Sequence, residues 1–130
     1  MKDLYKNYIR INQKILNKVN AHDLEKFFNR IKQIKIKNKK ILIFGNGAGA
    51  SIASHFSNDI TNAIKIKCLS FDSSTQLTCY ANDFGYNNWV KETIKNFSEK
   101  GDLVILISAS GNSANMIQAA KYCKKNKIQF

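Results

Sequence analysis

The sequence predicts an α/β fold with a parallel sheet, and three observations lead to that prediction. Two short apolar runs, residues 41–44 and 103–107, are each followed by a turn rich in glycine or serine and then by a helical pattern. A third strand-to-helix unit begins with the apolar run at 66–71. Strands that alternate with helices in this way form parallel sheets with right-handed helical crossovers.

The composition indicates one globular domain. The chain has 130 residues, of which 44% are hydrophobic and 23% are charged, so it is long enough to bury a core. No apolar run approaches the length of a membrane span, and the charged N-terminus lacks the apolar stretch of a signal peptide. We therefore expect a cytoplasmic protein that makes no membrane contact.

The net charge of +12 raises the question of a nucleic-acid partner. The basic residues are spread along the chain, apart from a group of lysines within 32–40, and no nucleic-acid motif accompanies them. We therefore expect no nucleic-acid partner and attribute the charge to a solvated surface.

The cysteines argue for a reducing compartment. Cys68, Cys79 and Cys123 are odd in number and widely spaced, and none forms a CxxC pair. This excludes a disulfide framework and a cysteine zinc site. We expect all three to be small buried hydrophobic residues.

Two helices are expected before the first strand, over residues 2–19 and 23–35. In each, apolar residues recur every three or four positions and so share one helix face. The apolar positions are Leu4, Tyr8, Ile11, Ile15, Val19, Leu24, Phe27, Phe28, Ile31 and Ile34. Either both helices cover the sheet, or part of this surface meets a partner subunit, and the sequence leaves both readings open.

The first strand, residues 41–44, is followed by the glycine turn 45–49 and by a helix over about 50–62. Glycines let a ligand approach the backbone, and a helix N-terminus attracts an anion. Gly45 and Gly47 have the spacing of a dinucleotide fingerprint, but Ala50 replaces its last glycine and no acidic residue is suitably placed downstream. A smaller phosphorylated ligand therefore fits the turn better than a dinucleotide.

The middle of the chain carries the second strand at 66–71 and a short helix over 72–80. A polar loop follows at 82–86, and a further helix is expected over 88–97.

The third strand, residues 103–107, is apolar throughout, which predicts burial on both faces. The turn that follows offers hydroxyl donors from Ser108, Ser110 and Ser113, and Gly111 permits close approach, ahead of a helix over about 112–125. This pattern predicts a phosphate cradle without a lysine. The alternative is an ordinary turn in which Asn112 or Ser113 merely caps the helix.

The last residues, 128–130, begin a fourth strand. A parallel strand of about three residues seldom forms a finished sheet edge, so we expect a truncated chain or one completed by another chain. The expected organisation is a single domain over 1–130, with N-terminal helices over 1–37 and a C-terminally incomplete βα core over 38–130.

Three stretches resemble a known family. They are GNGAGASIASHF at 45–56, ANDFGY at 81–86 and ISASGNSANMIQA at 107–119. They are similar to the sugar isomerase (SIS) domain and, within it, to the phosphoheptose isomerase branch. The resemblance covers nearly the whole chain. It implies a three-layer flavodoxin-like domain with two N-terminal helices, in which the first and third strands are neighbours and both turns face one crevice.

The resemblance also implies which residues contact a phosphosugar. The serine turn would hold the phosphate through Ser108, Ala109, Ser110 and Ser113. The remaining substrate contacts would be Asn46, Gly47, Ala48, Asn82 and Asp83. The chain departs from its relatives at Ala109, where Thr is frequent, at Ala48, where Gly is usual, and at Gly49, where Ser is usual.

The catalytic residues implied by the resemblance are His55 and Asp59, four residues apart on one helix. The family interconverts sedoheptulose 7-phosphate and D-glycero-D-manno-heptose 7-phosphate through an enediol, often with zinc. Both residues match metal-ligand positions, although Asp59 stands where relatives carry Glu, and the family's other two ligands fall beyond residue 130. Without the resemblance, His55 is better explained as a helix histidine that faces solvent or a core partner, since lone helix histidines seldom bind a metal.

Two functional hypotheses follow from the resemblance. The first is a phosphoheptose isomerase, or a shortened copy of one, that forms a homotetramer and supplies heptose for lipopolysaccharide or capsule. The second is a non-catalytic SIS module that senses a phosphosugar or binds a protein. The loop at 82–86 and His55 favour the first hypothesis. The departures from the family pattern and the missing C-terminal part favour the second.

Overall fold

The computed structural model describes residues 1–130, which form two compact units, Met1–Arg30 and Ile31–Phe130. The first unit contains α1 (Lys2–Leu16) and the beginning of α2 (Ala21–Ile36), which ends in the second unit. None of the helices combines the length and the apolar character that a membrane span requires.

No residue of α1 is buried, so its predicted apolar stripe faces solvent in the isolated chain. The helix ends earlier than expected. The amides of Lys18 and Val19 donate to carbonyls only three residues back, which is the tighter turn of a helix end. In α2 the apolar pattern divides, because Phe28 is exposed whereas Ile31 and Ile34 are buried.

The sheet of the second unit is parallel, as predicted, and its strand order is β2-β1-β3. The strands are β1 (Ile41–Gly45), β2 (Cys68–Ser70) and β3 (Leu103–Ile107). Beyond β3, Gln129 forms a parallel bridge with Leu103, and its carbonyl accepts from Val104 N at 2.9 Å. The order β2-β1-β3, followed by this last segment, is that of a flavodoxin-like fold.

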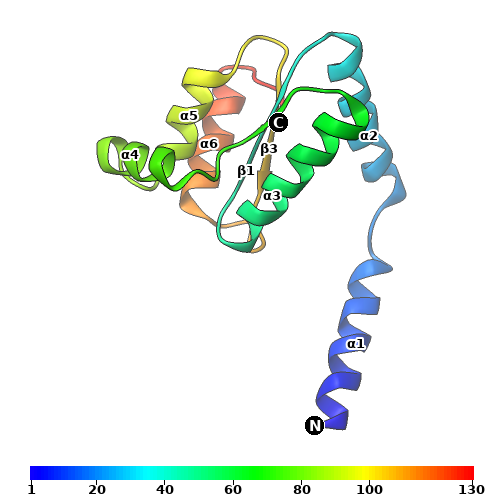
Figure 1. Ribbon diagram of the computed structural model, residues 1–130. Coiled ribbons are helices and arrows are strands. Elements are labelled where there is room, and N and C mark those ends of the chain that lie inside the picture. The colour runs from blue at the N-terminus through cyan, green and yellow to red at the C-terminus, as the bar shows by residue number, and fades with distance from the viewer. The chain divides into compact units, whose positions relative to one another are not determined.

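Helices cover both faces of the sheet and complete the three layers (Figure 1). On one face lies α3 (Ala48–Asp59), which runs into the π-helical turn η1 (Ile60–Ile64). On the other face lie α5 (Trp89–Phe97) and α6 (Ala114–Lys125), with α4 (Ser74–Phe84) beside α5.

The core follows from the alternation of side chains along β1. Leu42 and Phe44 point to the α5–α6 face, where the Phe44 ring stacks on Phe71 at 4.8 Å. Every residue of β1 is buried. The prediction that the third strand is buried on both faces is wrong for its second half, since Ile105–Ile107 are only half-buried. A single bridge covers that edge of β3, whereas β1 has a strand on each side.

Three further expectations need correction. Only Cys68–Ser70 of the second apolar run pairs with β1, although Ile66 and Phe71 at its ends are buried. Cys79 is exposed on α4, because it does not lie on the face that packs against the core. The segment 82–84 belongs to α4 rather than to a loop, and the helix ends at Gly85, whose φ of 78° favours glycine.

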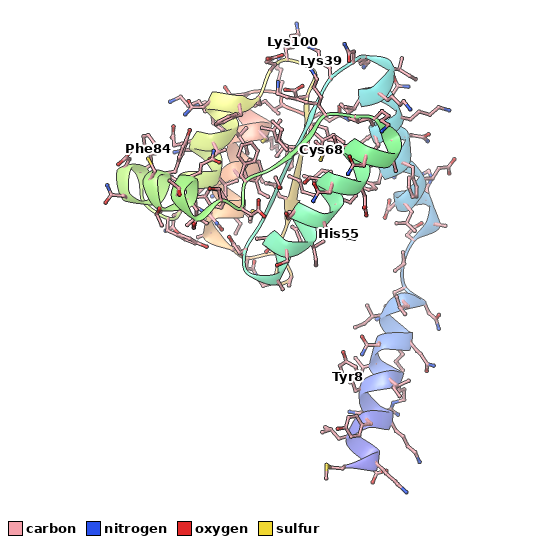
Figure 2. The ribbon with its side chains drawn as sticks, in the orientation of Figure 1. Tyr8, Lys39, His55, Cys68, Phe84 and Lys100 are labelled. Carbon is pink, nitrogen blue, oxygen red and sulfur yellow. The ribbon has the colours of Figure 1, made fainter.

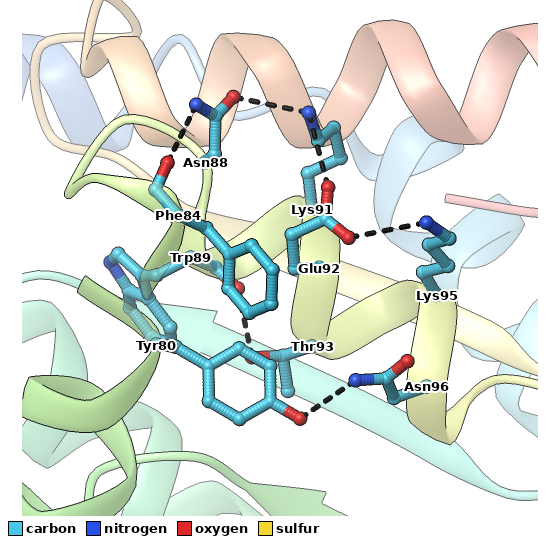
Figure 3. Close-up of polar contacts among 9 residues, drawn as sticks. All are labelled: Tyr80, Phe84, Asn88, Trp89, Lys91, Glu92, Thr93, Lys95 and Asn96. Atoms are coloured by element: carbon cyan, nitrogen blue, oxygen red, sulfur yellow. Dashed lines mark hydrogen bonds and ion pairs between the residues drawn. The ribbon is translucent and has the colours of Figure 1, made fainter. Parts of the chain in front are cut away.

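Short polar contacts hold the corner between α4 and α5 (Figure 3). Asn88 Nδ2 donates to the carbonyl of Phe84 at 2.9 Å, and Lys91 Nζ donates to Asn88 Oδ1 at 3.1 Å. On the next turn of α5, Asn96 Nδ2 donates to the Tyr80 hydroxyl at 2.9 Å. These bonds fix the short connection 85–88, whose position matters for the site described next.

Candidate functional site

The carboxyl ends of β1 and β3 are neighbours, and the turns that follow them meet at one edge of the sheet (lower edge in Figure 1). Between these turns lies a cleft of about 420 Å³. It is lined by Asn46, Ala48, Gly49, Ile52, Ile107, Ser108, Ala109, Ser110 and Ser113. The structure therefore brings together the glycine turn and the serine turn, which are about 60 residues apart in sequence.

Close packing shapes the glycine turn. A Cβ atom on Gly45 would collide with the backbone of Gly49 and Ala50, so the strand meets the helix only if residue 45 has no side chain. Gly47 precedes the first residue of α3 with a φ of 53°, where glycine is favoured. No side chain caps this helix, but the amides of Gly49 and Ala50 already donate to the carbonyls of Asn46 and Gly47 at 2.9 Å each. The first amide of the helix, that of Ala48, is left for a ligand.

The serine turn is a network of hydroxyl contacts. Asn112 N donates to Ser110 Oγ at 3.1 Å, and the hydroxyls of Ser108 and Ser113 share a hydrogen bond of 3.1 Å. Gly111 has a φ of 67° and its amide donates to the Ser108 carbonyl at 3.2 Å. Ser113 occupies the N-cap position of α6 without capping it through its side chain. The simple capping alternative is therefore not what this turn does.

The electrostatics of the cleft favour an anion. Two helices, α3 and α6, begin at its edge, and the partial positive charge of a helix N-terminus acts at short range. No acidic side chain lines the cleft, and the three serine hydroxyls supply further donors. The arrangement can bind a phosphate group through backbone amides and hydroxyls.

Two residues that the sequence interpretation did not assign join this site. Asn115, on α6, and Tyr86, in the α4–α5 connection, both hydrogen-bond the side chain of Asn46. Asn115 is only 1% exposed. A signal for it existed in the sequence, because it is a polar residue beside the apolar positions Met116 and Ala119 of the same helix.

Some predicted contact residues lie outside the cleft lining. Asn82 and Asp83 are exposed in the last turn of α4, where Asn82 Nδ2 donates to Asp83 Oδ1 at 3.0 Å. Gly47 is at the start of α3 but does not line the cleft either. Their predicted contacts with a sugar remain predictions.

His55 and Asp59 form a pair on the outer side of α3, one to two helical turns beyond the cleft residue Ile52. His55 Nε2 lies 3.5 Å from Asp59 Oδ2, and their side chains are 82% and 67% exposed. Figure 2 labels His55 on this helix. No third His, Cys, Asp or Glu completes a metal-binding group. The described residues thus offer two donors, fewer than the three or four protein ligands of a zinc site.

Comparison with known proteins identifies the relatives of this chain. Residues 5–129 match the SIS domain family. A phosphoheptose isomerase from Fusobacterium nucleatum is 33% identical over 107 residues, which are 78% of this chain and 55% of that protein. A phosphoheptose isomerase from Buchnera aphidicola is 30% identical over 97% of this chain and 65% of its own length. One from Campylobacter concisus is 33% identical over 96% of this chain and 70% of its own length.

Solved structures show the same fold. The structure of a phosphoheptose isomerase from Neisseria gonorrhoeae matches with a TM-score of 0.83 and 27% identity, over 95% of this chain and 67% of that one. A second, from Francisella tularensis, has a TM-score of 0.82 at 19% identity, over 95% of this chain and 69% of that one, and supports the fold alone. The chain spans 55% and 65% of the Fusobacterium and Buchnera relatives.

Proposed function

This chain belongs to the SIS domain family, and we propose that it binds a phosphosugar in the cleft between its glycine and serine turns, as the phosphate-binding part of a phosphoheptose isomerase. The observation that carries the proposal is the meeting of two helix N-termini and three serine hydroxyls in a cleft without acidic side chains. The similarity to phosphoheptose isomerases supports the choice of a heptose 7-phosphate as ligand.

The proposed reaction is the interconversion of sedoheptulose 7-phosphate and D-glycero-D-manno-heptose 7-phosphate. An aldose–ketose shift requires a base that moves a proton between adjacent carbons. We assign this role to the His55–Asp59 pair, whose side chains are 3.5 Å apart and whose positions three and seven residues after Ile52 place them on the same face of α3 as that cleft residue. A zinc ion at this pair would need donors from outside the described residues, so we assign no step to a metal.

Thermal unfolding with and without ligand tests the phosphate site. Sedoheptulose 7-phosphate should raise the unfolding temperature of the chain, because a ligand that binds only the native state stabilises it. Unphosphorylated sedoheptulose at the same concentration is the matched control and should raise it much less. An equal rise in unfolding temperature with both sugars, or no rise with either, would contradict a site that binds phosphate.

Turnover tests the catalytic part of the proposal separately. If the chain binds the phosphosugar but does not isomerise it, the regulatory alternative applies, in which a SIS module senses the ligand without converting it. Loss of isomerisation in His55→Asn, with unchanged ligand binding, would support the assignment of the pair.

We also propose self-association through the N-terminal unit, with a homotetramer as the expected form. This is supported by the exposed apolar side chains of α1, including Leu4, Tyr8 and Ile15. A cytoplasmic role in heptose supply for lipopolysaccharide or capsule completes the proposal, and the three cysteines, none of which forms a disulfide, fit a reducing compartment.

A further inference from the structure

We infer that Asn115 is a positioning residue that holds Asn46 as a hydrogen-bond donor toward the ligand in the cleft. The inference rests on the proposed function, because it concerns the same ligand. It comes from a chain of hydrogen bonds that starts at the backbone of α6, passes through two side-chain amides and ends at the cleft.

The backbone sets the orientation of the Asn115 amide. Met116 N donates to Asn115 Oδ1 at 3.0 Å. A backbone N–H requires an acceptor, so the oxygen of the amide, and not its nitrogen, must face Met116. Asn115 is 1% exposed, so solvent cannot satisfy the groups if the amide is reversed.

The orientation of Asn115 in turn sets that of Asn46. Asn115 Nδ2 donates to Asn46 Oδ1 at 2.9 Å, and Asn46 Nδ2 donates back to Asn115 Oδ1 at 3.0 Å. Turning the Asn46 amide over would place donor against donor and acceptor against acceptor. The Tyr86 hydroxyl donates to Asn46 Oδ1 at 3.2 Å. Because a hydroxyl can also accept, Tyr86 follows the orientation that Asn115 sets and does not impose it.

Counting donors and acceptors shows what Asn46 has left for a ligand. Its Oδ1 has two lone pairs, which Asn115 and Tyr86 occupy. One of the two hydrogens on Nδ2 goes to Asn115. The second Nδ2 hydrogen is the only hydrogen-bonding group of this side chain that is still available. Asn46 lines the cleft, so this hydrogen can reach a ligand there. Toward the ligand, Asn46 is therefore a donor, which suits a phosphate or sugar oxygen.

The hydrogen bonds of Asn46 connect three segments of the chain at its side chain. Asn46 belongs to the turn after β1, Asn115 to the first turn of α6, and Tyr86 to the α4–α5 connection. That connection is held by the Asn88 contact to the Phe84 carbonyl (Figure 3) and by the amide of Asn88, which donates to the Gly85 carbonyl at 2.9 Å. The first residues of α6 also follow the serine turn. The hydrogen bonds between Asn46 and Asn115 therefore link the two sides of the cleft.

A double-mutant cycle tests the inference by calorimetric titration with sedoheptulose 7-phosphate. Asn115→Leu keeps a similar volume but removes both amide partners, and should weaken binding about tenfold. Tyr86→Phe removes one hydroxyl at a half-exposed residue and should weaken binding about threefold. In an Asn46→Ala background neither change should alter the dissociation constant by more than about twofold, because both act through Asn46.

The control is Asn62→Leu, the same substitution at an exposed asparagine of η1, which should leave binding unchanged. If Asn115→Leu weakens binding equally with and without Asn46, its effect is general and the inference is wrong. An unchanged dissociation constant for both single variants also overturns it. Should Asn115→Leu fail to fold, Asn115→Ala replaces it in the same cycle, with the same expected and contradicting outcomes.

A spectroscopic measurement separates this inference from the proposed function. The two Nδ2 hydrogens of every asparagine differ in chemical shift, because rotation about the amide C–N bond is slow. In ¹⁵N-resolved NMR spectra without ligand, their separation at Asn46 should exceed that at the exposed Asn62, because one of them is bonded to Asn115, and Asn115→Leu should remove the excess. Ligand should then shift chiefly the unpaired hydrogen. If the native chain binds no phosphosugar, the proposed function fails, while the ligand-free spectra still decide whether the amide is locked. A separation at Asn46 no larger than that at Asn62 would overturn the lock.

Discussion

The three serines of the cleft differ in what their hydroxyls already do. Ser108 and Ser113 share one hydrogen bond, so one of their two hydroxyl hydrogens is committed. Ser110 Oγ accepts from Asn112 N and keeps its own hydrogen free. The structure thus singles out Ser110 as the serine that both shapes the turn and retains a donor for an anion.

Ser110→Ala should weaken phosphosugar binding by about 1–3 kcal/mol, because it removes a donor to a charged group and leaves the amide of Asn112 without its acceptor. Calorimetric titration measures the change. Ser74→Ala, at an exposed serine that begins α4, is the matched control and should bind like the native chain. An unchanged dissociation constant for Ser110→Ala would remove this residue from the site.

The cysteines should differ sharply in reactivity. Burial raises the pKa of the Cys68 thiol to about 12 and that of Cys123 to about 11, whereas Cys79 is exposed. The native chain at pH 8 should therefore react rapidly with a thiol reagent at one site, since the thiolate is the nucleophile. Cys79→Ser should abolish the rapid phase, and denaturant should release the other two thiols. A rapid phase that survives in Cys79→Ser would contradict this assignment.

At the scale of elements, an ion pair joins the starts of two strands at the edge of the sheet opposite the cleft. Asp102, which is 1% exposed, accepts from the backbone amides of Lys40 and Glu99 at 3.0 and 2.8 Å. Lys40 Nζ lies 2.8 Å from Asp102 Oδ2 and 3.3 Å from Glu99 Oε1. These contacts hold the segment before β3 against the residue before β1.

Lys40→Met should lower the free energy of unfolding by about 3 kcal/mol at pH 8, because it leaves a buried carboxylate without its cation. Urea denaturation measures the loss. Lys95→Met is the matched control. Lys95 is exposed and Glu92 keeps Lys91 as a second cation, so the loss should be less than about 1 kcal/mol. Equal stabilities of Lys40→Met and the native chain would contradict a structural role for the pair.

The stabilisation by Lys40 should also depend on pH. Burial alone lowers the pKa of Lys40, but the hydrogen bond and charge of Asp102, followed by those of Glu99, outweigh it and raise the pKa above 10.5. A group whose pKa is raised on folding stabilises the native state fully below its unfolded pKa and loses that effect as pH rises through the folded value. The difference in unfolding free energy between the native chain and Lys40→Met should therefore shrink above about pH 10.5. A difference that stays constant to pH 12 would contradict it.

At the scale of the whole molecule, the N-terminal unit has an amphipathic helix, α1, whose apolar side chains are exposed. Tyr8 is 66% exposed and Ile15 is 59% exposed, although both belong to the predicted apolar stripe of α1. Such a continuous apolar surface is typical of an interface with a partner. Self-association through α1 is the form of partner that we propose.

Ile15→Glu should reduce the molar mass measured by light scattering, because it places a charge within the proposed apolar interface. Lys14→Glu changes the charge at the neighbouring exposed position of the same helix and should preserve the oligomer. A native chain that is monomeric at micromolar concentration would contradict the proposed assembly, and an Ile15→Glu oligomer of native mass would exclude α1 from the interface.

Local patterns in the sequence were sufficient to predict the order of strands and helices and the parallel sheet. The apolar runs at 41–44 and 103–107 and the turns after them predicted parallel strands and helices, because periodicity and turn chemistry depend on near neighbours. The errors concern features that depend on distant packing. The second half of β3 is half-buried because of what lies beside it, and α4 continues to Phe84.

The sequence by itself determined that a glycine turn and a serine turn follow two strands of a parallel sheet, since glycine and serine at those positions dictate local backbone and hydroxyl chemistry. The family resemblance already implied that both turns face one crevice. Only the tertiary structure decided that Asn82 and Asp83 lie outside its lining and that Asn115 and Tyr86 converge on Asn46. The physical reason is that a hydrogen bond between residues 69 positions apart depends on strand order and helix packing, which no local pattern encodes.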